Sequence, residues 1–154
     1  LLGMRAESRY EGQAAMELEG LAAAHGPESA PPGGYAIRDN ELDFSPLLPT
    51  LLACDDPGRG AALFHATVAA GLAEWALVAV DRENEAKIAV GGGCAMNAVL
   101  MSALRRHLEA RGVALLEARQ APPNDGGLAL GQGWVARRMG DGIVPSQCKV
   151  AEHR

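Results

Sequence analysis

Apolar positions in the second half of the chain follow two spacings, one typical of short buried strands and one typical of helices. The apolar run at residues 88–90 ends at three glycines, and residues 98–109 then carry apolar side chains at a helical period. The same order repeats, because the apolar run at residues 113–116 precedes a turn and a second helical pattern over residues 128–139. This half of the chain therefore predicts two successive strand–turn–helix units.

The two strands, near residues 88–92 and 113–118, are expected to be parallel, because crossovers of this kind join parallel strands with a right-handed connection. Their short apolar runs lack alternation, which is typical of strands covered on both faces. Both glycine-rich turns, residues 91–97 and 121–127, would then lie at the carboxyl edge of the sheet, where open α/β sheets bind ligands. The predicted fold class is α/β, with at least four helices around a small sheet.

The first part of the chain predicts a helix, a loop and a hairpin. Residues 14–24 have apolar side chains at a helical spacing, and residues 25–34 hold three prolines and three glycines. Residues 35–38 and 41–44 could pair across Asp39-Asn40 as a short hairpin.

Further helices are predicted in the middle of the chain. Ser45 and Pro46 form a helix start signal, with Ser45 as N-cap, for a helix to about residue 53. Residues 61–80 form the longest apolar-periodic segment and predict a buried helix, followed by a polar turn at residues 81–86. Residues 140–154 show no period and predict a loosely ordered tail.

Composition sets modest bounds on the kind of protein. A chain of 154 residues with 48% hydrophobic content is large enough for one domain with a core. Only 4% of its residues are aromatic, so the core is expected to consist of Ala, Leu and Val. The net charge of −5 argues against a general nucleic-acid binder, which would carry a basic face.

Cysteine usage and the apolar runs bear on the compartment. Cys54, Cys94 and Cys148 are odd in number and far apart, so they provide neither a disulfide framework nor a Cys-x-x-Cys site. A reducing cytoplasm fits this pattern best. No apolar run is expected to reach membrane-spanning length. The chain does not begin with Met, and we expect it to be a fragment.

The glycine-rich turns carry the candidate chemistry, and each candidate residue has a structural alternative. Three glycines after a strand allow a phosphate to approach the backbone, but they also serve close helix–strand packing. Asn97 could be an N-cap or a ligand contact. Asp125 could be a cap or turn residue, or a carboxylate ligand of a metal ion.

The four histidines do not form a metal motif. His65 lies on the predicted buried helix, where we expect a satisfied core residue, whereas His25, His107 and His153 are expected to be exposed. No two of them have His-x-x-x-His spacing. This chain alone is therefore not expected to build a two-histidine metal site.

Three motifs resemble one known family. Residues 10–19 read YEGQAAMELE, residues 91–97 read GGGCAMN, and residues 122–132 read PPNDGGLALGQ. Together they closely resemble the C-terminal, TsaD-like transferase domain of HypF, the carbamoyltransferase of nickel–iron hydrogenase maturation. The segments at 42–48 and 64–76 are also similar, so the resemblance covers residues 1–139. Gly91 stands where that family usually has a serine.

The resemblance implies a fold and an activity. The fold would be a partial lobe of a sugar-kinase/Hsp70/actin-type (RNase H-like) domain. HypF-like proteins use carbamoyl phosphate and ATP to form carbamoyl-adenylate, and they carbamoylate the C-terminal cysteine of HypE for cyanide ligand synthesis. The implied partners are therefore a HypE-like acceptor protein, the remaining HypF domains, carbamoyl phosphate and ATP, with no membrane and no nucleic acid.

The resemblance also implies site residues. Gly92, Gly93 and Asn97 match the nucleotide-contacting turn, and Gly12, Gln13 and Glu17 fall where related enzymes touch the ribose. Glu17 has a simple alternative as a solvated helix carboxylate. Asp125 matches the aspartate that, with two histidines, holds a divalent metal of iron or zinc type. Those histidines would lie outside this chain, so the fragment alone is expected to be inactive and metal-free, with one sheet edge unpaired.

Two alternatives come from other classes. The chain could be a non-catalytic binding or assembly module, or part of a TsaD-like tRNA threonylcarbamoyl-transferase. The motifs at residues 10–13 and 124–127 favour the HypF resemblance over the tRNA-modifying one.

Overall fold

The computed structural model describes residues 2–3 and 7–140, and within them helices outnumber strands. The helices are α1 (Gln13–His25), α2 (Leu48–Leu52), α3 (Pro57–Glu83), α4 (Ala98–Glu109) and α5 (Leu128–Gly140). The strands are β1 (Ala36–Arg38), β2 (Glu41–Asp43), β3 (Lys87–Ala89) and β4 (Ala114–Leu116), and three 3₁₀ segments are η1 (Ser45–Leu47), η2 (Gly93–Met96) and η3 (Asp125–Gly127). The expected tail lies outside the described residues except for Gly140, which ends α5.

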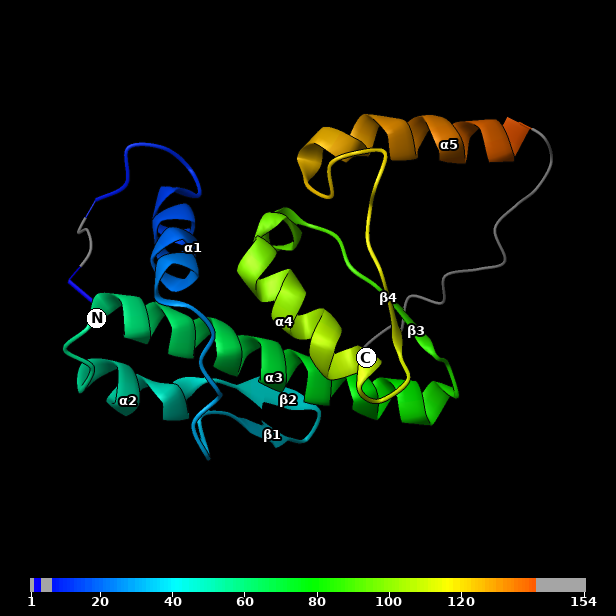
Figure 1. Cartoon of the computed structure of the whole chain (residues 1–154). Coiled ribbons are helices and arrows are strands. Elements are labelled where there is room, and N and C mark those ends of the chain that lie inside the picture. Colours follow the sequence, from blue (N-terminus) through cyan, green and yellow to red (C-terminus); the bar gives the residue numbers. More distant parts are fainter. Residues whose placement is uncertain (1, 4–6, 141–154) are drawn as a thin grey trace, which may run out of the picture.

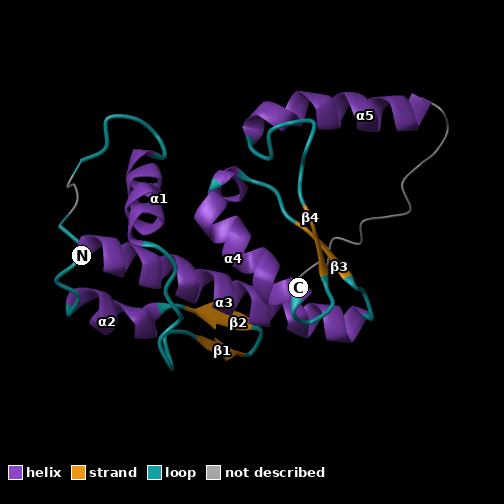
Figure 2. Ribbon diagram, viewed as in Figure 1, coloured by secondary structure: helices purple, strands orange, loops and turns teal. Residues whose placement is uncertain are grey.

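Helix α3 is the element on which the others pack (Figure 1). Helices α1 and α4 cross it on one side and the β1–β2 hairpin lies on the other (Figure 2). The core is built mainly from Ala and Leu, as the composition predicts. Its largest cluster joins α3 and α4 through Ala69, Ala73, Leu77, Met101, Ala103, Leu104, Leu108 and Val113. Small Ala side chains at Ala22, Ala61 and Ala62 let α1 pack closely on α3.

By length and composition, α3 could cross a membrane. It has 27 residues and is the one helix in the described part of the chain that is apolar enough. The expectation that no apolar run reaches this length is therefore wrong. In the fold, however, α3 packs against α1 and α4, and the core helix of a soluble protein passes the same test. Length and composition alone do not assign α3 to a membrane.

Strands β3 and β4 are parallel, which confirms the predicted pairing. Their register places Ile88 beside Leu115, and both side chains pack against the α3–α4 cluster. The neighbouring residues Lys87, Ala89 and Leu116 are exposed. The expectation of strands covered on both faces is therefore wrong for the described residues, because helices lie on only one face.

The predicted hairpin is confirmed, and it docks on α3 through aromatic side chains. Strands β1 and β2 pair antiparallel around Asp39 and Asn40, both of which have positive φ. A Cβ at Gly71 of α3 would lie 2.8 Å from the Phe44 ring, so the glycine lets that ring approach the helix backbone. The Trp75 Nε1–H also donates to the Asn40 carbonyl at 2.9 Å.

The predicted helix start at Ser45 is corrected. Ser45 does not cap a helix: its N–H and hydroxyl both donate to the Asp43 carboxylate at 2.8 Å, and a 3₁₀ turn follows. Pro49 has no N–H to donate to the Ser45 carbonyl, so the first turn closes with an i→i+3 bond from Leu48 instead.

Helix α3 is longer than predicted at both ends. It begins at Pro57, where the Asp56 carboxylate accepts from the Gly58 N–H. It continues into the first half of the expected polar turn as far as Glu83, and Asn84 in the left-handed conformation ends it. The apolar period stops earlier because the last turn projects into solvent, which permits polar side chains without ending the helix.

Helix α5 confirms the second helical pattern but differs from the other long helices in its surroundings. None of its residues is buried, and it stands apart from the α1–α3–α4 layer in Figure 1. Its exposed apolar side chains include Leu128, Leu130, Trp134 and Val135. The helical period thus predicted α5 correctly, although this helix buries no side chain among the described residues.

Candidate functional site

The two glycine-rich turns lie against each other at the carboxyl ends of β3 and β4. Val90 continues the strand pairing, since its N–H donates to the Leu116 carbonyl at 3.0 Å. The Gly92 N–H then donates to the Pro123 carbonyl at 2.6 Å, directly joining the first turn to the second. This confirms the expectation that both turns meet at one edge of the sheet.

The glycines of the two turns have different structural roles. Gly92 has φ +93°, a conformation that side chains rarely adopt, and a Cβ at Gly92 or Gly93 would meet nothing within 4 Å. A Cβ at Gly127 would instead lie 2.5 Å from the Pro122 carbonyl oxygen, and one at Gly126 would lie 2.9 Å from the same proline's ring. The first turn is therefore open, whereas Gly126 and Gly127 of the second turn allow close packing on Pro122.

Asn97 is the N-cap of α4. Its Oδ1 accepts from the Leu100 N–H at 2.8 Å, which is the capping alternative raised from the sequence. Its Nδ2 lies 2.9 Å from Nε2 of His65 on α3. His65 is only 3% exposed and also bonds the Ala61 carbonyl through Nδ1, so the expectation of a satisfied core histidine is confirmed.

A carboxylate from α1 also occupies the N-terminus of α4. Glu19 Oε1 accepts from the Ala98 N–H at 2.7 Å, although α1 is far away in the sequence. Part of the positive end of α4 is therefore already neutralised by this carboxylate. Gly93 and Cys94 begin η2, and the first positions of a 3₁₀ segment have N–H groups without a partner inside it. Among the described residues, the Gly93 and Cys94 amides are therefore candidate donors for a ligand beside the partly occupied α4 terminus.

The first motif lies at the N-terminus of α1. Gly12 is its N-cap residue and has φ +79°, which explains why a glycine stands there. Gln13 is only 6% exposed; its side-chain oxygen accepts from the Arg9 N–H at 2.8 Å, and its Nε2 donates to Glu17 at 2.9 Å. Glu17 is half-buried and hydrogen-bonded, so it is not the simple solvated carboxylate of the alternative.

Asp125 is exposed and lies at the start of η3. The cap of this segment is its neighbour Asn124, whose Oδ1 accepts from the Gly126 N–H at 3.1 Å. The Asn124 amide also contacts the Met96 sulfur at 3.0 Å, a second link between the two turns. The capping alternative for Asp125 is therefore wrong, and its carboxylate forms no hydrogen bond or ion pair among the described residues. Those residues contain no group of three metal-ligating side chains.

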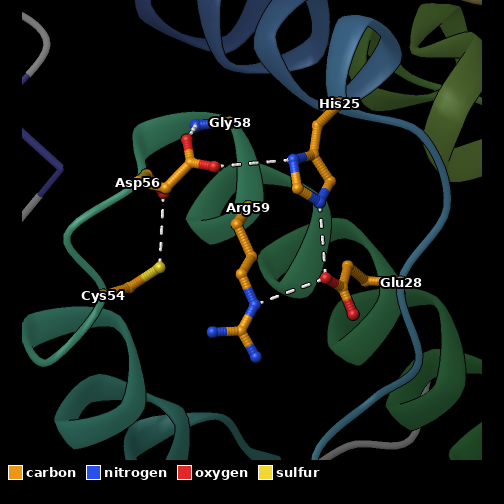
Figure 3. Close-up of polar contacts among 6 residues, drawn as sticks. All are labelled: His25, Glu28, Cys54, Asp56, Gly58 and Arg59. Carbon is orange, nitrogen blue, oxygen red and sulfur yellow. Dashed lines mark hydrogen bonds and ion pairs between the residues drawn. The ribbon is translucent and has the colours of Figure 1, made fainter.

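A second polar cluster, not expected from the sequence, joins the loop after α1 to the start of α3 (Figure 3). His25 lies 3.3 Å from the Glu28 carboxylate and 3.7 Å from that of Asp56. Arg59 pairs with the same Glu28 oxygen at 3.4 Å. These pairs need partners from three segments, which no spacing along the chain brings together. His25 is exposed as expected, but it is paired.

Beside this cluster lies a groove of about 460 Å³, lined by Pro49, Thr50, Ala53, Cys54, Arg59 and Leu63. Cys54 is half-buried at this groove, and its thiol donates to the Asp56 carbonyl at 3.3 Å. Cys54 and Cys94 are both free thiols, and they lie in different parts of the fold. The groove is separate from the turn pair, because it lies between α2 and the first turns of α3.

Comparison with known proteins defines the class. A family model described as "Carbamoyltransferase, Kae1-like Domain, second subdomain" matches residues 1–132. The chain therefore belongs to this carbamoyltransferase family, and the resemblance found in the three motifs is confirmed.

The relatives are HypF proteins. The chain is 44% identical to carbamoyltransferase HypF2 of Cupriavidus necator over 88% of its own length and 20% of the relative's. It is 43% identical to carbamoyltransferase HypF of Rhizobium leguminosarum bv. viciae, over 100% of its own length and again 20% of the relative's. The chain thus spans about a fifth of the length of these two relatives.

Solved HypF structures share the fold. A crystal structure of full-length HypF in the phosphate- and nucleotide-bound form superimposes with a TM-score of 0.77 at 29% identity, over 90% of this chain and 19% of that one. The structure of T. kodakarensis HypF gives a TM-score of 0.72 at 21% identity, over 92% and 19%. The predicted α/β fold class is therefore confirmed, and the fold is that of a Kae1-like domain.

Proposed function

We propose that the chain is part of a HypF-like carbamoyltransferase that uses carbamoyl phosphate and ATP to form carbamoyl-adenylate. The carbamoyl group would then pass to the C-terminal cysteine of a HypE-like acceptor protein, for the cyanide ligand of a nickel–iron hydrogenase. Family membership supports the transferase class. The observation that carries the role of this chain is the Gly92–Pro123 hydrogen bond, which joins the two turns at one sheet edge.

The nucleotide would bind at the open first turn. Gly93 has free space around its Cα, and the Gly93 and Cys94 amides are donors suited to a phosphate. Asn97 would act by holding this turn at the start of α4, since its amide already bonds Leu100 and His65. Gly12, Gln13 and Glu17 would contribute from α1, which reaches the same helix terminus through Glu19.

Asp125 would supply one ligand of a divalent metal of iron or zinc type. Its carboxylate is exposed, forms no hydrogen bond or ion pair among the described residues, and sits on the turn that is bonded to the nucleotide turn. One carboxylate holds a divalent ion weakly, so the other ligands would be histidines from outside this chain. Such an ion, when bound, would polarise a phosphate or carbamoyl oxygen as a Lewis acid.

The remaining HypF domains are the expected structural partners. Strands β3 and β4 pair only with each other among the described strands, which leaves two sheet edges open to further strands. The exposed apolar side chains of α5 are also consistent with a surface that the rest of the protein covers. We propose a cytoplasmic location, with neither a membrane nor nucleic acid as a partner.

The test is a Gly93→Val substitution in the complete protein. Gly93 has no positive φ, and a Cβ at this position would meet nothing within 4 Å, so valine should leave the fold intact while blocking the phosphate approach. Gly92→Val is less informative, because φ +93° would strain the turn in any case. Calorimetry should show at least a tenfold weaker affinity for ATP, and mass spectrometry should show loss of the carbamoyl adduct on HypE.

Gly20→Ala is the control, since Gly20 lies in α1, outside the sequence of both turns, with nothing within 4 Å of its Cβ position. It should keep both nucleotide affinity and transfer. If Gly93→Val bound ATP as tightly as the control, the glycines would be packing residues and the nucleotide site would lie elsewhere.

A further inference from the structure

His65 bonds the nucleotide turn from inside the core. Its ring is 3% exposed on α3, and Nδ1 lies 2.8 Å from the Ala61 carbonyl oxygen. A carbonyl only accepts, so Nδ1 carries the hydrogen. In the neutral ring Nε2 is then an acceptor, and the group facing it at 2.9 Å is the Nδ2 donor of Asn97.

The orientation of the Asn97 amide is set independently at its other end. Its Oδ1 accepts from the Leu100 N–H at 2.8 Å, so oxygen must face α4 and nitrogen must face His65. The chain of bonds from Ala61 through His65 and Asn97 to Leu100 is consistent in only one direction. If Nε2 carried a hydrogen, it would face another donor, and turning the amide over would break the cap of α4.

The turn before α4 depends on the same residue. The Asn97 N–H donates to the Cys94 carbonyl at 3.1 Å, and the Asn97 carbonyl accepts from Met101 at 2.9 Å. Asn97 therefore connects helix α4 to the short η2 segment, which carries the Gly93 and Cys94 amides. A shift of its side chain would move both.

We infer that His65 is a positioning residue: its Nε2 holds the Asn97 amide in the capping orientation and thereby sets the geometry of the 91–97 turn. The effect of His65 on catalysis rests on the proposed nucleotide role of that turn. The hydrogen bond between His65 and Asn97 does not depend on that proposal. His65 does not touch the open side of the turn, so it would act through Asn97 rather than on the substrate.

The experiment compares three variants of the complete protein. His65→Leu removes the acceptor and keeps an apolar side chain, and His65→Gln restores a side-chain oxygen able to accept from Asn97. Thr67→Val is the control, because the Thr67 hydroxyl is fully buried on the same helix and also bonds a carbonyl four residues back, that of Leu63. Thr67→Val therefore removes a buried hydrogen bond of the same helix without affecting Asn97, and it controls for a general loss of core stability.

Hydrogen exchange at the Leu100 amide is the direct readout, since that N–H is the one Asn97 caps. His65→Leu should accelerate its exchange about tenfold or more, with His65→Gln close to the unsubstituted protein and Thr67→Val unchanged. Equal acceleration in His65→Leu and Thr67→Val would overturn the inference, as would a Gln variant that behaves like the Leu variant. The Gln comparison still decides the matter if the Leu protein does not fold.

ATP affinity, measured alongside Gly93→Val, separates this inference from the proposed function. We expect His65→Leu to weaken ATP binding about tenfold, whereas Thr67→Val should bind ATP as tightly as the unsubstituted protein. Faster Leu100 exchange without any effect of Gly93→Val on affinity would support the positioning role of His65 and refute the nucleotide role of the turn. Normal exchange with a strong Gly93→Val effect would do the opposite.

Discussion

The Asn97→Ala substitution tests the link between α3 and α4 most directly, because it removes both side-chain bonds of the N-cap at once. Losing the cap on Leu100 should cost about 1 kcal/mol. Leaving the buried His65 Nε2 without a partner should add about 1–3 kcal/mol. The expected local loss is therefore about 2–4 kcal/mol, a large share of the ~5–15 kcal/mol that stabilises a typical domain.

Native-state hydrogen exchange is the suitable assay, because unfolding of a protein with several domains does not give one free energy. If local opening controls exchange, 2–4 kcal/mol corresponds to roughly 30- to 700-fold faster exchange of the amides in the first turn of α4. Ser102→Ala is the control, since Ser102 is exposed on the same helix. Acceleration of less than about threefold in Asn97→Ala would refute the reasoning that these two bonds hold the turn.

Asn97→Asp separates the two bonds. The carboxylate keeps the cap and suits the positive end of a helix, but it places an acceptor against the acceptor nitrogen of His65. Exchange at the Leu100 amide should therefore be faster than in the unsubstituted protein, although the cap itself is kept. Leu100 exchange as slow in this variant as in the unsubstituted protein would contradict the assigned direction of the bond.

Three further predictions concern other parts of the fold. Gly71→Ala should destabilise the protein by about 1–3 kcal/mol, because a Cβ would lie 2.8 Å from the Phe44 ring. Gly20→Ala has open space around its Cβ position and should stabilise the protein by up to ~1 kcal/mol, so equal shifts of the two variants in thermal melts would contradict this reasoning. Burial and the hydrogen bond to Glu74 raise the pKa of Tyr35 to about 12 from 10.0, so between pH 10 and 12 the Tyr35 hydroxyl ionises only in the unfolded chain. The free energy of unfolding should therefore fall as the pH rises through this window, and alkaline denaturation of Tyr35→Phe should lack this part of the decline. Asp125→Asn in the complete protein should lose metal and carbamoyl transfer with little change in melting temperature, whereas Asn124→Ala, which removes the η3 cap, should lower the melting temperature. Metal analysis and a HypE carbamoylation assay test this, and full metal occupancy in Asp125→Asn would refute the ligand role.

Local signals in the sequence were sufficient for the elements and for the meeting of the two turns. The helical periods over 98–109 and 128–139 correctly predicted α4 and α5, because side chains three and four residues apart share a helix face whatever surrounds it. The parallel pairing of β3 and β4 followed from the order strand–helix–strand alone. Once the strands are parallel, their carboxyl ends must lie together, which is why Gly92 and Pro123 meet.

The errors arose where a residue's role depends on a partner outside the local pattern. Ser45 has the chemistry of an N-cap, but the Asp43 carboxylate engages its hydroxyl and Pro49 prevents the first α-helical bond. Likewise the capping role at the second turn belongs to Asn124, because the fold of the turn brings its side chain, rather than that of Asp125, to the Gly126 amide.

Only the tertiary structure decided how α1 and α3 support the site. Glu19 reaches the Ala98 amide across 79 positions, and His65 reaches Asn97 across 32, so neither contact leaves a periodic signal in the sequence. A helical pattern determines which face of a helix is apolar, but not which polar group at the edge of that face will meet a partner. Here the packing of small Ala side chains brings α1 and α3 close enough for these two side chains to hold the start of α4. The sequence by itself thus determined the elements and the turns, and the close approach of three helices determined which polar atoms hold them in place.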